Sequence, residues 1–464
     1  MDFLEKIYHK SPIPFQTAML NGKALGLYFE RYGAKFERMS EQFDANQFMR
    51  KSELDSYQNE RLIRLIDHAF ESVPFYKERF KKAKLKPQDI KSKEDLFKIP
   101  ALTKKDIKSN FNSLISTRAN SKRLRKGNTS GTTGAPLTVL YDINTCVVHH
   151  VADHRQKAWA GMQRREAYAS LQGRVICPPS QDHPPFWRKN YINNQLFLSS
   201  FHLKKEFIQF FIDKLKKDEI KFIEGYPSTI YTLASFLSIT DQSLPMTAVL
   251  TSSETLYNWQ RKLIEERFSC RVFDFYGMAE RTVYATECEE HSGHHLNEDY
   301  GITEFLSIDN EPLAAGEFGK IVATSLHNFA FPLIRYQTND SCALKLEDCS
   351  CGRAFPLMDD VATKEEAIIQ LPDGRWISPS VLTHPFKPMV NIEESQIIQE
   401  DLENICIRIV KGEHYTQADE ALLLKGFQDR LGNDVRFKVE YPEKIERTTS
   451  GKLKWVISHA KHQF

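Results

Sequence analysis

The chain has 464 residues, more than one compact hydrophobic core usually holds, so two or three packed units are expected. Its 63 Lys and Arg residues nearly balance 61 Asp and Glu residues, which argues against a nucleic-acid-binding protein. No apolar run approaches the roughly 20 residues that span a bilayer. The first six residues also lack the basic start and apolar core of a signal peptide. We therefore expect a cytoplasmic protein with no membrane or nucleic-acid partner.

The first 125 or so residues are expected to be mainly helical. Residues 60–70 place apolar side chains at helical spacing, and Ser72-Val73-Pro74 ends that pattern. Residues 104–126 carry many basic side chains without strong periodicity. We interpret them as a solvated approach to the next motif.

From Lys126 onward, short β runs alternate with amphipathic helices, which predicts a largely parallel α/β sheet. Chemistry is then expected in the loops at strand ends. The predicted strands are 139–141, 169–172, 175–177, 221–226, 248–252 and 271–276, and a helix is predicted at 207–215.

A second change of pattern falls near residues 361–366. Beyond it, a hairpin is predicted around Pro372-Asp373-Gly374, with strands at 405–410 and 435–439 and a helix between them. These roughly 100 residues suffice for a small α+β domain.

Thr129, Ser130, Gly131, Thr132, Thr133 and Gly134 form the sharpest local motif. Glycines let a backbone approach an anion closely, and hydroxyls and exposed N–H groups can bind phosphate oxygens. The motif is not the lysine-containing P-loop. A surface turn is the alternative, because turns favour the same residues.

Three further segments have a functional reading beside a structural one. Tyr276 and Gly277 precede Glu280, which would place an aromatic ring for a base and a carboxylate for Mg²⁺ at a strand end. The alternative is a core tyrosine followed by a helix-capping acid.

Asp340 lies in a loop after a strand-like segment at 320–324. It could accept both ribose hydroxyls, or it could be a turn residue paired with Arg335. Lys452, in a polar glycine loop, could stabilise developing negative charge, or it could be a solvated tail lysine.

Three of the eight cysteines form a candidate zinc site with a histidine. Cys349 and Cys351 are one residue apart, and Cys288 with His295 could complete a tetrahedral set. His291 or His294 would be substitutes for His295. The alternative is two unrelated loops with reduced thiols.

The order of the four motifs resembles the adenylate-forming superfamily of acyl-CoA synthetases, adenylation domains and luciferases. Residues 72–76, 316–319 and 332–336 make the chain most similar to the branch of phenylacetate-CoA ligases and capsule-biosynthesis ligases. The resemblance covers about residues 55–455. It implies a large α/β N-terminal adenylate-forming domain over residues 1–363, with mixed, largely parallel sheets. A small, mobile α+β C-terminal domain over 364–464 would then carry the catalytic lysine.

The resemblance also implies roles for single residues. Residues 129–134 look like the phosphate loop, Tyr276 to Glu280 the adenine and magnesium segment, and Asp340 the ribose-binding acid. Lys452 looks like the adenylation lysine, and residues 251–254, including Ser253 and Glu254, the segment beside adenine and the acyl group. Some members of the branch have residues similar to the Cys/His set, whose closed site would be structural.

Two positions depart from the family pattern. Residues 362–366 (Ala-Thr-Lys-Glu-Glu) stand where the family usually has Gly-Arg followed by acids, so the hinge arginine that touches ribose is absent. Asn339 replaces the glycine that usually precedes the ribose-binding acid. Asn tolerates positive φ better than most residues, so the second change is mild.

The implied function is ATP-dependent activation of a small carboxylic acid as its acyl-AMP, with transfer to coenzyme A. The alternatives are transfer to a sugar, amine or carrier protein, or a non-catalytic nucleotide-binding relative. ATP, Mg²⁺, structural Zn²⁺ and coenzyme A are the expected cofactors or co-substrates, and a homodimer is the family's habit. The acid pocket is expected around Tyr226, Thr251 and Tyr276. His149, His150 and His154 could contribute to it, but we expect them to be exposed helix histidines.

Overall fold

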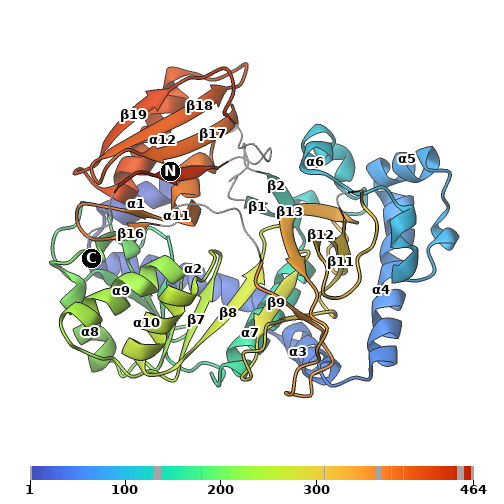
Figure 1. Ribbon diagram of the computed structural model, residues 1–464, viewed down its shortest axis with the longest axis horizontal. Helices are drawn as coiled ribbons and strands as arrows, with labels where there is room; N and C mark the ends of the chain where they lie inside the picture. Colours follow the sequence, from blue (N-terminus) through green and yellow to red (C-terminus); the bar gives the residue numbers. More distant parts are fainter. Residues whose placement is uncertain are drawn as a thin grey trace.

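A computed structural model describes residues 3–128, 137–178, 180–307, 309–361, 368–377, 379–389, 391–446 and 454–460. The predicted helical lead-in is present, with α1 and α2 on the left of Figure 1 and α4, α5 and α6 on the right. Its α-helices are α1 (Phe3–Lys10), α2 (Ile13–Arg31), α3 (Ala34–Asn46), α4 (Lys51–Ser72), α5 (Pro74–Lys82) and α6 (Lys104–Ser109), with 3-10 turns at Pro87–Asp89, Lys93–Lys98, Phe111–Leu114 and Ser121–Arg123.

Helix α4 shows how the apolar pattern determines this region. Leu62, Leu65 and Ile66 recur at helical spacing and are fully buried in one core. Pro74 cannot continue α4 but is suited to the first turn of α5, where it stands. The solvated approach predicted for residues 104–126 is only partly correct. Ile107 and Leu114 are buried in the same core, on short helices with too few turns to show a periodicity.

A nine-stranded sheet in the order β14-β10-β9-β8-β7-β6-β3-β5-β4 forms the centre of the chain. Neighbours among β5, β3, β6, β7 and β8 pair in parallel, as predicted, and the remaining strands pair antiparallel. The strands are β3 (Tyr168–Leu171), β4 (Trp187–Asn190), β5 (Gln195–Leu198), β6 (Phe222–Gly225), β7 (Ala248–Ser252), β8 (Arg271–Gly277), β9 (Tyr284–Glu287), β10 (His294–Leu296) and β14 (Leu357–Met358).

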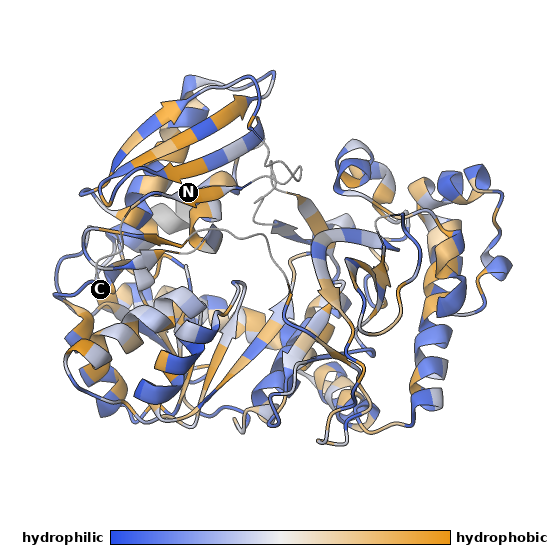
Figure 2. Ribbon diagram, viewed as in Figure 1, coloured by the Kyte–Doolittle hydropathy of each residue, from blue (hydrophilic) through white to orange (hydrophobic). Residues whose placement is uncertain are grey.

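Helices cover this sheet. Helices α8 (Ile208–Lys217), α9 (Pro227–Ile239) and α10 (Asn258–Phe268) share one hydrophobic core with strands β3 and β5 to β8. Helix α7 (Ile143–Trp159) instead packs with α3 against Tyr284 and Tyr300. Figure 2 shows apolar residues concentrated on β7 and β8, which fits strands that are covered by helices.

The strand predicted at residues 175–177 is absent, and that prediction is wrong. Strand β3, which precedes this segment, is already paired on one side with β5 and on the other with β6. The segment therefore has no free sheet edge beside it, and Ile176 and Cys177 are buried as irregular chain.

Two smaller β units lie beside the main sheet. Strands β1 (Arg125–Asn128) and β2 (Thr138–Tyr141) form an antiparallel hairpin, and β11 (Gly301–Leu306), β12 (Phe318–Ser325) and β13 (Tyr336–Ala343) form an antiparallel sheet. Asp340 lies inside β13, so its predicted loop position is wrong. The strand runs from Tyr336 to Ala343, and its pairing with β12 shifts register between Lys320 and Val322.

The C-terminal part has its own sheet, in the order β19-β18-β17-β20, and its own core around the fully buried Trp455. This matches the predicted α+β unit, whose boundary at 363/364 lies outside the described residues and stays a prediction. Its elements are β15 (Ile369–Gln370), β16 (Trp376–Ile377), α11 (Pro379–Thr383), the 3-10 turn His384–Phe386, β17 (Ile392–Gln399), β18 (Asn404–Lys411), α12 (Gln417–Leu431), β19 (Arg436–Glu440) and β20 (Val456–Ser458).

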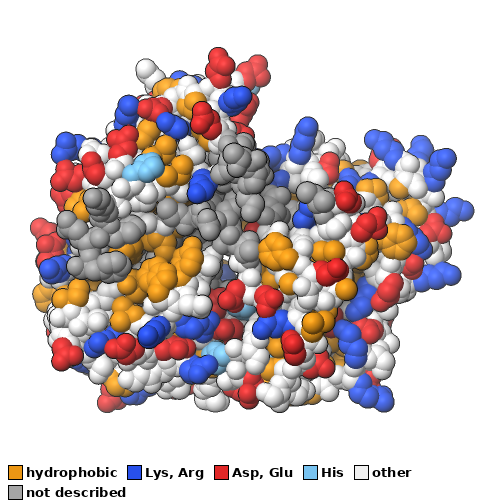
Figure 3. Space-filling view, in the orientation of Figure 1, with side chains coloured by type: hydrophobic (Ala, Val, Ile, Leu, Met, Phe, Trp, Pro, Cys, Tyr) orange, Lys and Arg blue, Asp and Glu red, His pale blue; other side chains and the backbone are white. Residues whose placement is uncertain are grey.

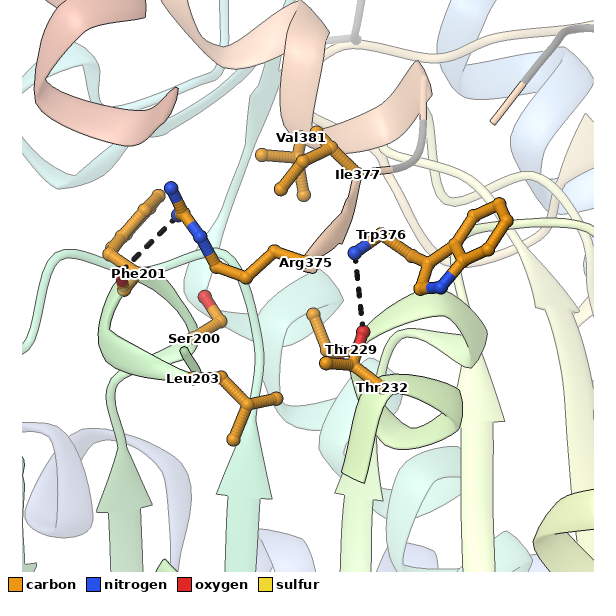
Figure 4. Close-up of a pocket in the computed structure, with 9 residues that line it drawn as sticks. All are labelled: Ser200, Phe201, Leu203, Thr229, Thr232, Arg375, Trp376, Ile377 and Val381. Carbon is orange, nitrogen blue, oxygen red and sulfur yellow. Dashed lines mark hydrogen bonds between the residues drawn. The ribbon is translucent and has the colours of Figure 1, made fainter. Parts of the chain in front are cut away.

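A small pocket lies where the predicted β15–β16 hairpin meets the rest of the chain (Figure 4). Arg375 is buried there and donates to the carbonyls of Phe201, Arg430 and Leu431, while Asp373 lies 2.8 Å from its Nε. Arg375 thus ties the hairpin both to the chain before β6 and to the end of α12.

The surface carries mixed charge. In Figure 3 acidic and basic side chains are interspersed, and apolar side chains gather beside α9 and α10. None of the helices in the described part of the chain is long and apolar enough to cross a membrane.

Candidate functional site

Two of the predicted segments, residues 251–254 and Tyr276 to Glu280, lie at the carboxyl ends of the parallel strands β7 and β8, where open α/β sheets bind their ligands. The Tyr276 hydroxyl, near the end of β8, donates to Asp340 Oδ2 on β13 at 2.8 Å. Burial raises the pKa of Tyr276 well above its ordinary value, and the Asp340 carboxylate raises it further, so the phenol stays a donor. Two residues that are 64 positions apart therefore form one side of the site.

Glu280 lies in the turn after β8 and is buried. The Tyr336 hydroxyl donates to its Oε1 at 2.5 Å, and burial raises the pKa of Glu280 while the Lys104 ammonium lowers it. Among the described residues this buried carboxylate accepts one side-chain hydrogen bond and has no ion pair within 4 Å, although the Lys104 charge acts on it from farther away. A hard cation such as Mg²⁺, which prefers carboxylate oxygens, fits this position.

The end of β7 supplies the neighbouring wall. Ser253 has a φ of 69°, a left-handed value that turns the chain sharply after the strand. Glu254 then accepts a hydrogen bond from the Ser228 backbone N–H at 3.2 Å, at the start of α9. The predicted acyl segment is thus fixed to a helix N-terminus beside Tyr226.

The phosphate-loop residues Thr129 to Gly134 and the predicted catalytic residue Lys452 lie outside the described residues. The two strands that flank the loop are described, and they form the β1–β2 hairpin. The Tyr141 hydroxyl at the end of β2 donates to the Ala279 carbonyl. The base of the loop is therefore joined to the turn that carries Glu280.

The predicted Cys/His set comes together. The ligand atoms of Cys288, His295, Cys349 and Cys351 all lie within 4.8 Å of one another. Cys288 Sγ is 3.6 Å from Cys349 Sγ, and His295 Nε2 is 3.3 Å from Cys288 Sγ and 3.4 Å from Cys351 Sγ. The alternative of two unrelated thiol loops is wrong.

These distances fit a tetrahedral zinc ion. Bonds of about 2.3 Å to sulfur place two ligands of a tetrahedron about 3.8 Å apart, and somewhat less where one ligand is nitrogen. The His295 Nδ1 lies 2.8 Å from the Phe355 carbonyl oxygen, which would keep the proton on Nδ1 and leave Nε2 free for a metal. The four side chains are therefore placed close enough together to hold one Zn²⁺.

The substitutes proposed for His295 have other roles. His294 Nε2 lies 3.1 Å from Asp274 Oδ2, and His291 Nδ1 lies 3.6 Å from Glu287 Oε2. Asp274 also accepts from the Thr251 hydroxyl at 2.5 Å. No sequence pattern predicted these contacts, through which His294, the neighbour of His295, is connected by Asp274 to Thr251 on β7.

The sequence of the chain is similar to those of known proteins over most of its length. The chain is 27% identical to the protein CapK of Staphylococcus aureus over 470 residues, covering 99% of this chain and 100% of that protein. It is 24% identical to a phenylacetate-coenzyme A ligase of Thermus thermophilus over 451 residues, covering 88% and 97% of the two chains. The chain is a relative of CapK and of the phenylacetate-coenzyme A ligases. Its residues 369–459 match the CapK C-terminal domain family.

The fold is also that of solved adenylate-forming ligases. A 2-hydroxyisobutyryl-CoA ligase, solved with 2-HIB-AMP and CoA in its thioesterification state, aligns with a TM-score of 0.61 and 19% identity, covering 90% of this chain and 92% of that chain. The predicted superfamily, branch and fold class, and the assignment to an enzyme family that includes acid–thiol ligases, are confirmed.

Two predictions about single residues are wrong, and several others stay untested. The pairing of Asp340 with Arg335 is wrong, because Arg335 is buried and bonds Glu304 at 2.9 Å. The histidines of α7 are not exposed: His149 lies 3.1 Å from the Tyr300 hydroxyl, and His150 is half-buried. The roles assigned to the site residues, and the homodimer, stay predictions.

Proposed function

We propose that the protein activates a small carboxylic acid with ATP and then transfers the acyl group to coenzyme A. A carboxylate oxygen forms a bond to the α-phosphorus while the bond between that phosphorus and the α–β bridging oxygen breaks, which releases pyrophosphate. The sulfur of coenzyme A then bonds to the acyl carbon, its thiol proton is lost to solvent, and AMP leaves with the former carboxylate oxygen.

The contact between Tyr276 and Asp340 carries this proposal. The Tyr276 ring is suited to stacking on adenine, and the Asp340 carboxylate is suited to accepting both ribose hydroxyls. The Tyr276 hydroxyl lies 2.8 Å from Asp340 Oδ2, so the two groups are side by side. Glu280 would hold Mg²⁺, whose charge offsets the repulsion between the attacking carboxylate and the phosphates. Thr129 to Gly134 would bind the leaving pyrophosphate, Lys452 would bridge carboxylate and α-phosphate, and Ser253, Glu254 and Gly277 would line the nucleotide.

The proposal that coenzyme A accepts the acyl group is supported by the names of the similar proteins. Several of them are named phenylacetate-coenzyme A ligases, which favours coenzyme A. The relative that matches the chain over almost its full length is CapK, and its name specifies no acceptor. A sugar, an amine or a carrier protein is therefore the second candidate acceptor.

We also propose that Cys288, His295, Cys349 and Cys351 bind one structural Zn²⁺. The set leaves no open position for a substrate, which is typical of structural sites. Cys288 directly follows β9 and His295 lies on β10, whereas Cys349 and Cys351 come from the loop before β14, so the ion would join the β9–β10 hairpin to that loop.

The test is pyrophosphate release from Mg-ATP with pooled carboxylic acids, with and without coenzyme A, followed by mass spectrometry. Acid-dependent pyrophosphate together with an acyl-CoA mass is the expected result. Pyrophosphate with an acyl-AMP mass alone would instead support another acceptor. ATP binding without pyrophosphate from any pool would support the non-catalytic alternative.

A further inference from the structure

A cluster of two arginines and two histidines lies beside the turn that carries Glu280. It consists of Arg31 at the end of α2, Arg281 in the turn after β8, and His149 and His150 on α7. Aromatic rings surround it, from Tyr32, Tyr141, Tyr284 and Tyr300. Arg281 directly follows Glu280, and Tyr141 bonds Ala279, so the cluster adjoins the proposed metal end of the site.

Arg281 is held firmly but is poorly neutralised. Its Cζ lies 4.1 Å from the centroid of the Tyr141 ring, and its backbone has a φ of 55°, uncommon for a residue with a Cβ. Stacking on a ring uses the face of a guanidinium and leaves its N–H groups, which point outward in the plane, unbonded. Within the described ranges, the side-chain N–H groups of Arg281 make one hydrogen bond, from Nη1 to the weak acceptor Cys146 Sγ at 3.3 Å.

Arg31 is also incompletely bonded within the described part of the chain. Its Nε is buried and has no hydrogen-bond partner among the described residues. Burial lowers the pKa of Arg31, and the nearby Arg281 guanidinium lowers it further. Burial also lowers the pKa of His149 and His150 well below the ordinary value, with Arg281 and Arg31 adding to the effect, so both imidazoles are neutral donors or acceptors.

The carboxylates around the cluster are already engaged. Glu30 pairs with Arg125 at 2.5 Å, and Glu224 and Asp153 both pair with Lys157, at 2.9 and 3.0 Å. Glu280 accepts from Tyr336. Over the described ranges, neither Arg31 nor Arg281 has a carboxylate within ion-pair distance. Burying charge without an opposite charge is costly, so an anion from outside the chain would stabilise this arrangement.

We propose that Arg31 and Arg281 bind a second anionic group, a carboxylate or a phosphoryl, at the far end of the acyl substrate. This inference rests on the proposed function, because it takes the reacting carboxylate to lie beside Glu280. The donors would be the in-plane N–H groups of the two guanidiniums, which match the paired oxygens of such anions. The acid would then be a dicarboxylate or a phosphoryl-bearing acid, and the tyrosine rings suit a flat or short carbon skeleton between its ends.

Binding of matched acids in the presence of Mg²⁺ and a non-hydrolysable ATP analogue tests this directly. The pairs are glutarate against valerate, 4-carboxyphenylacetate against phenylacetate, and 4-phosphonobutyrate against valerate, each measured by calorimetry. We expect the acid with the second anion to bind at least about 10-fold more tightly, as one charge-assisted bidentate contact allows. The carboxylate and phosphonate arms identify which anion the site prefers.

The ratio of the two affinities in a pair, dianion over monocarboxylate, should fall toward 1 in each of the variants Arg281→Gln and Arg31→Gln. The affinity of each variant for the monocarboxylate should stay within about 3-fold of the wild-type value. Arg38→Gln, an exposed arginine on the neighbouring α3, is the matched control and should keep the wild-type ratio. Equal binding of both members of every pair to the wild-type protein, or a preference that survives both variants, would overturn the inference. Because binding is measured without turnover, the absence of pyrophosphate release would count against the proposed function and not against this result.

Discussion

The hydroxyl of Tyr276 lies 2.8 Å from the Oδ2 of Asp340 and so joins strand β8 of the nine-stranded sheet to strand β13 of the three-stranded sheet. Replacing Tyr276 with phenylalanine keeps the ring and removes this one hydrogen bond. Because Asp340 would then lose its orientation toward ribose, we expect the KM for ATP to rise about 5- to 20-fold, as loss of a hydrogen bond to a charged group costs about 1–2 kcal/mol. Initial rates of pyrophosphate release at varied ATP measure this effect.

Tyr441→Phe provides a matched control. Tyr441 also donates to a carboxylate, that of Glu420, but on the surface of the C-terminal part. Its loss should leave the KM for ATP unchanged. An unchanged KM in Tyr276→Phe as well would remove the ribose role from this pair.

Lys452→Ala should separate the two half-reactions. If the lysine stabilises charge only during adenylation, the variant should lose acyl-AMP formation by at least about 100-fold, the size of losing one transition-state contact. Attack of coenzyme A on a supplied acyl-AMP should stay within a few-fold of wild type. Equal loss of both half-reactions would contradict a lysine that acts in one of two domain orientations, whereas Lys454→Ala should affect neither.

Zinc content should depend on the loop before β14. The purified protein is expected to contain about one zinc per chain by elemental analysis, and the double variant Cys349→Ser/Cys351→Ser should lose it. Cys406→Ser, in the C-terminal sheet, is the control and should retain the metal. Chelation of wild type should lower the melting temperature, because binding to the folded state alone stabilises it. Unchanged zinc in the double variant would remove the proposed ligand set.

Arg375 should be important for docking of the C-terminal part. Arg375→Ala removes three donors from buried carbonyls and leaves Asp373 without its partner, so we expect the free energy of unfolding to fall by about 2–4 kcal/mol. Urea denaturation measures this change. Arg436→Ala breaks an exposed pair with Glu403 and should cost less than about 1 kcal/mol. Similar losses in the two variants would contradict a bracing role for Arg375.

Stability should fall in mild acid partly because of His327. Burial, together with the Arg61 guanidinium, lowers the pKa of His327 from 6.5 to about 4. Between those values the unfolded chain binds the proton and the folded chain does not, so the free energy of unfolding falls as the pH drops from 6.5 to 4. The contribution of this one group is on the order of 3 kcal/mol.

Urea denaturation at pH 7.5 and pH 4.5 tests this dependence. His327→Gln should lose part of the difference in stability between the two pH values, whereas His183→Gln, at an exposed histidine, should keep it. A pH dependence that is the same in wild type and His327→Gln would show that another group is responsible.

Much of the fold is local enough to be predicted from sequence. Strands β6, β7 and β8 are short apolar runs that end in polar turns, and each was predicted within about two residues. The strand predicted at residues 175–177 failed because strand formation needs a free edge, which depends on how β5 and β6 already flank β3. Sequence periodicity contains no information on such competition.

The candidate site also has a part that could be predicted from the sequence and a part that could not. Cys349 and Cys351 are close in sequence, and ligand chemistry limited the partners enough for Cys288 and His295 to be predicted. The cluster around Arg281 was missed, because arginines and histidines far apart in sequence are ordinary surface residues until folding buries them. The burial of His149 depends on helix α3 packing against α7, a contact that no local pattern specifies.

The central claim is that a carboxylate oxygen attacks the α-phosphorus of ATP, and an isotope measurement tests it most directly. An acid that supports pyrophosphate release would be supplied with ¹⁸O in its carboxylate, and the AMP and phosphate products would be weighed by mass spectrometry. Our account predicts that AMP gains one ¹⁸O when coenzyme A takes the acyl group, while the phosphate and pyrophosphate stay unlabelled. Label in inorganic phosphate, or AMP without label, would contradict an acyl-adenylate intermediate.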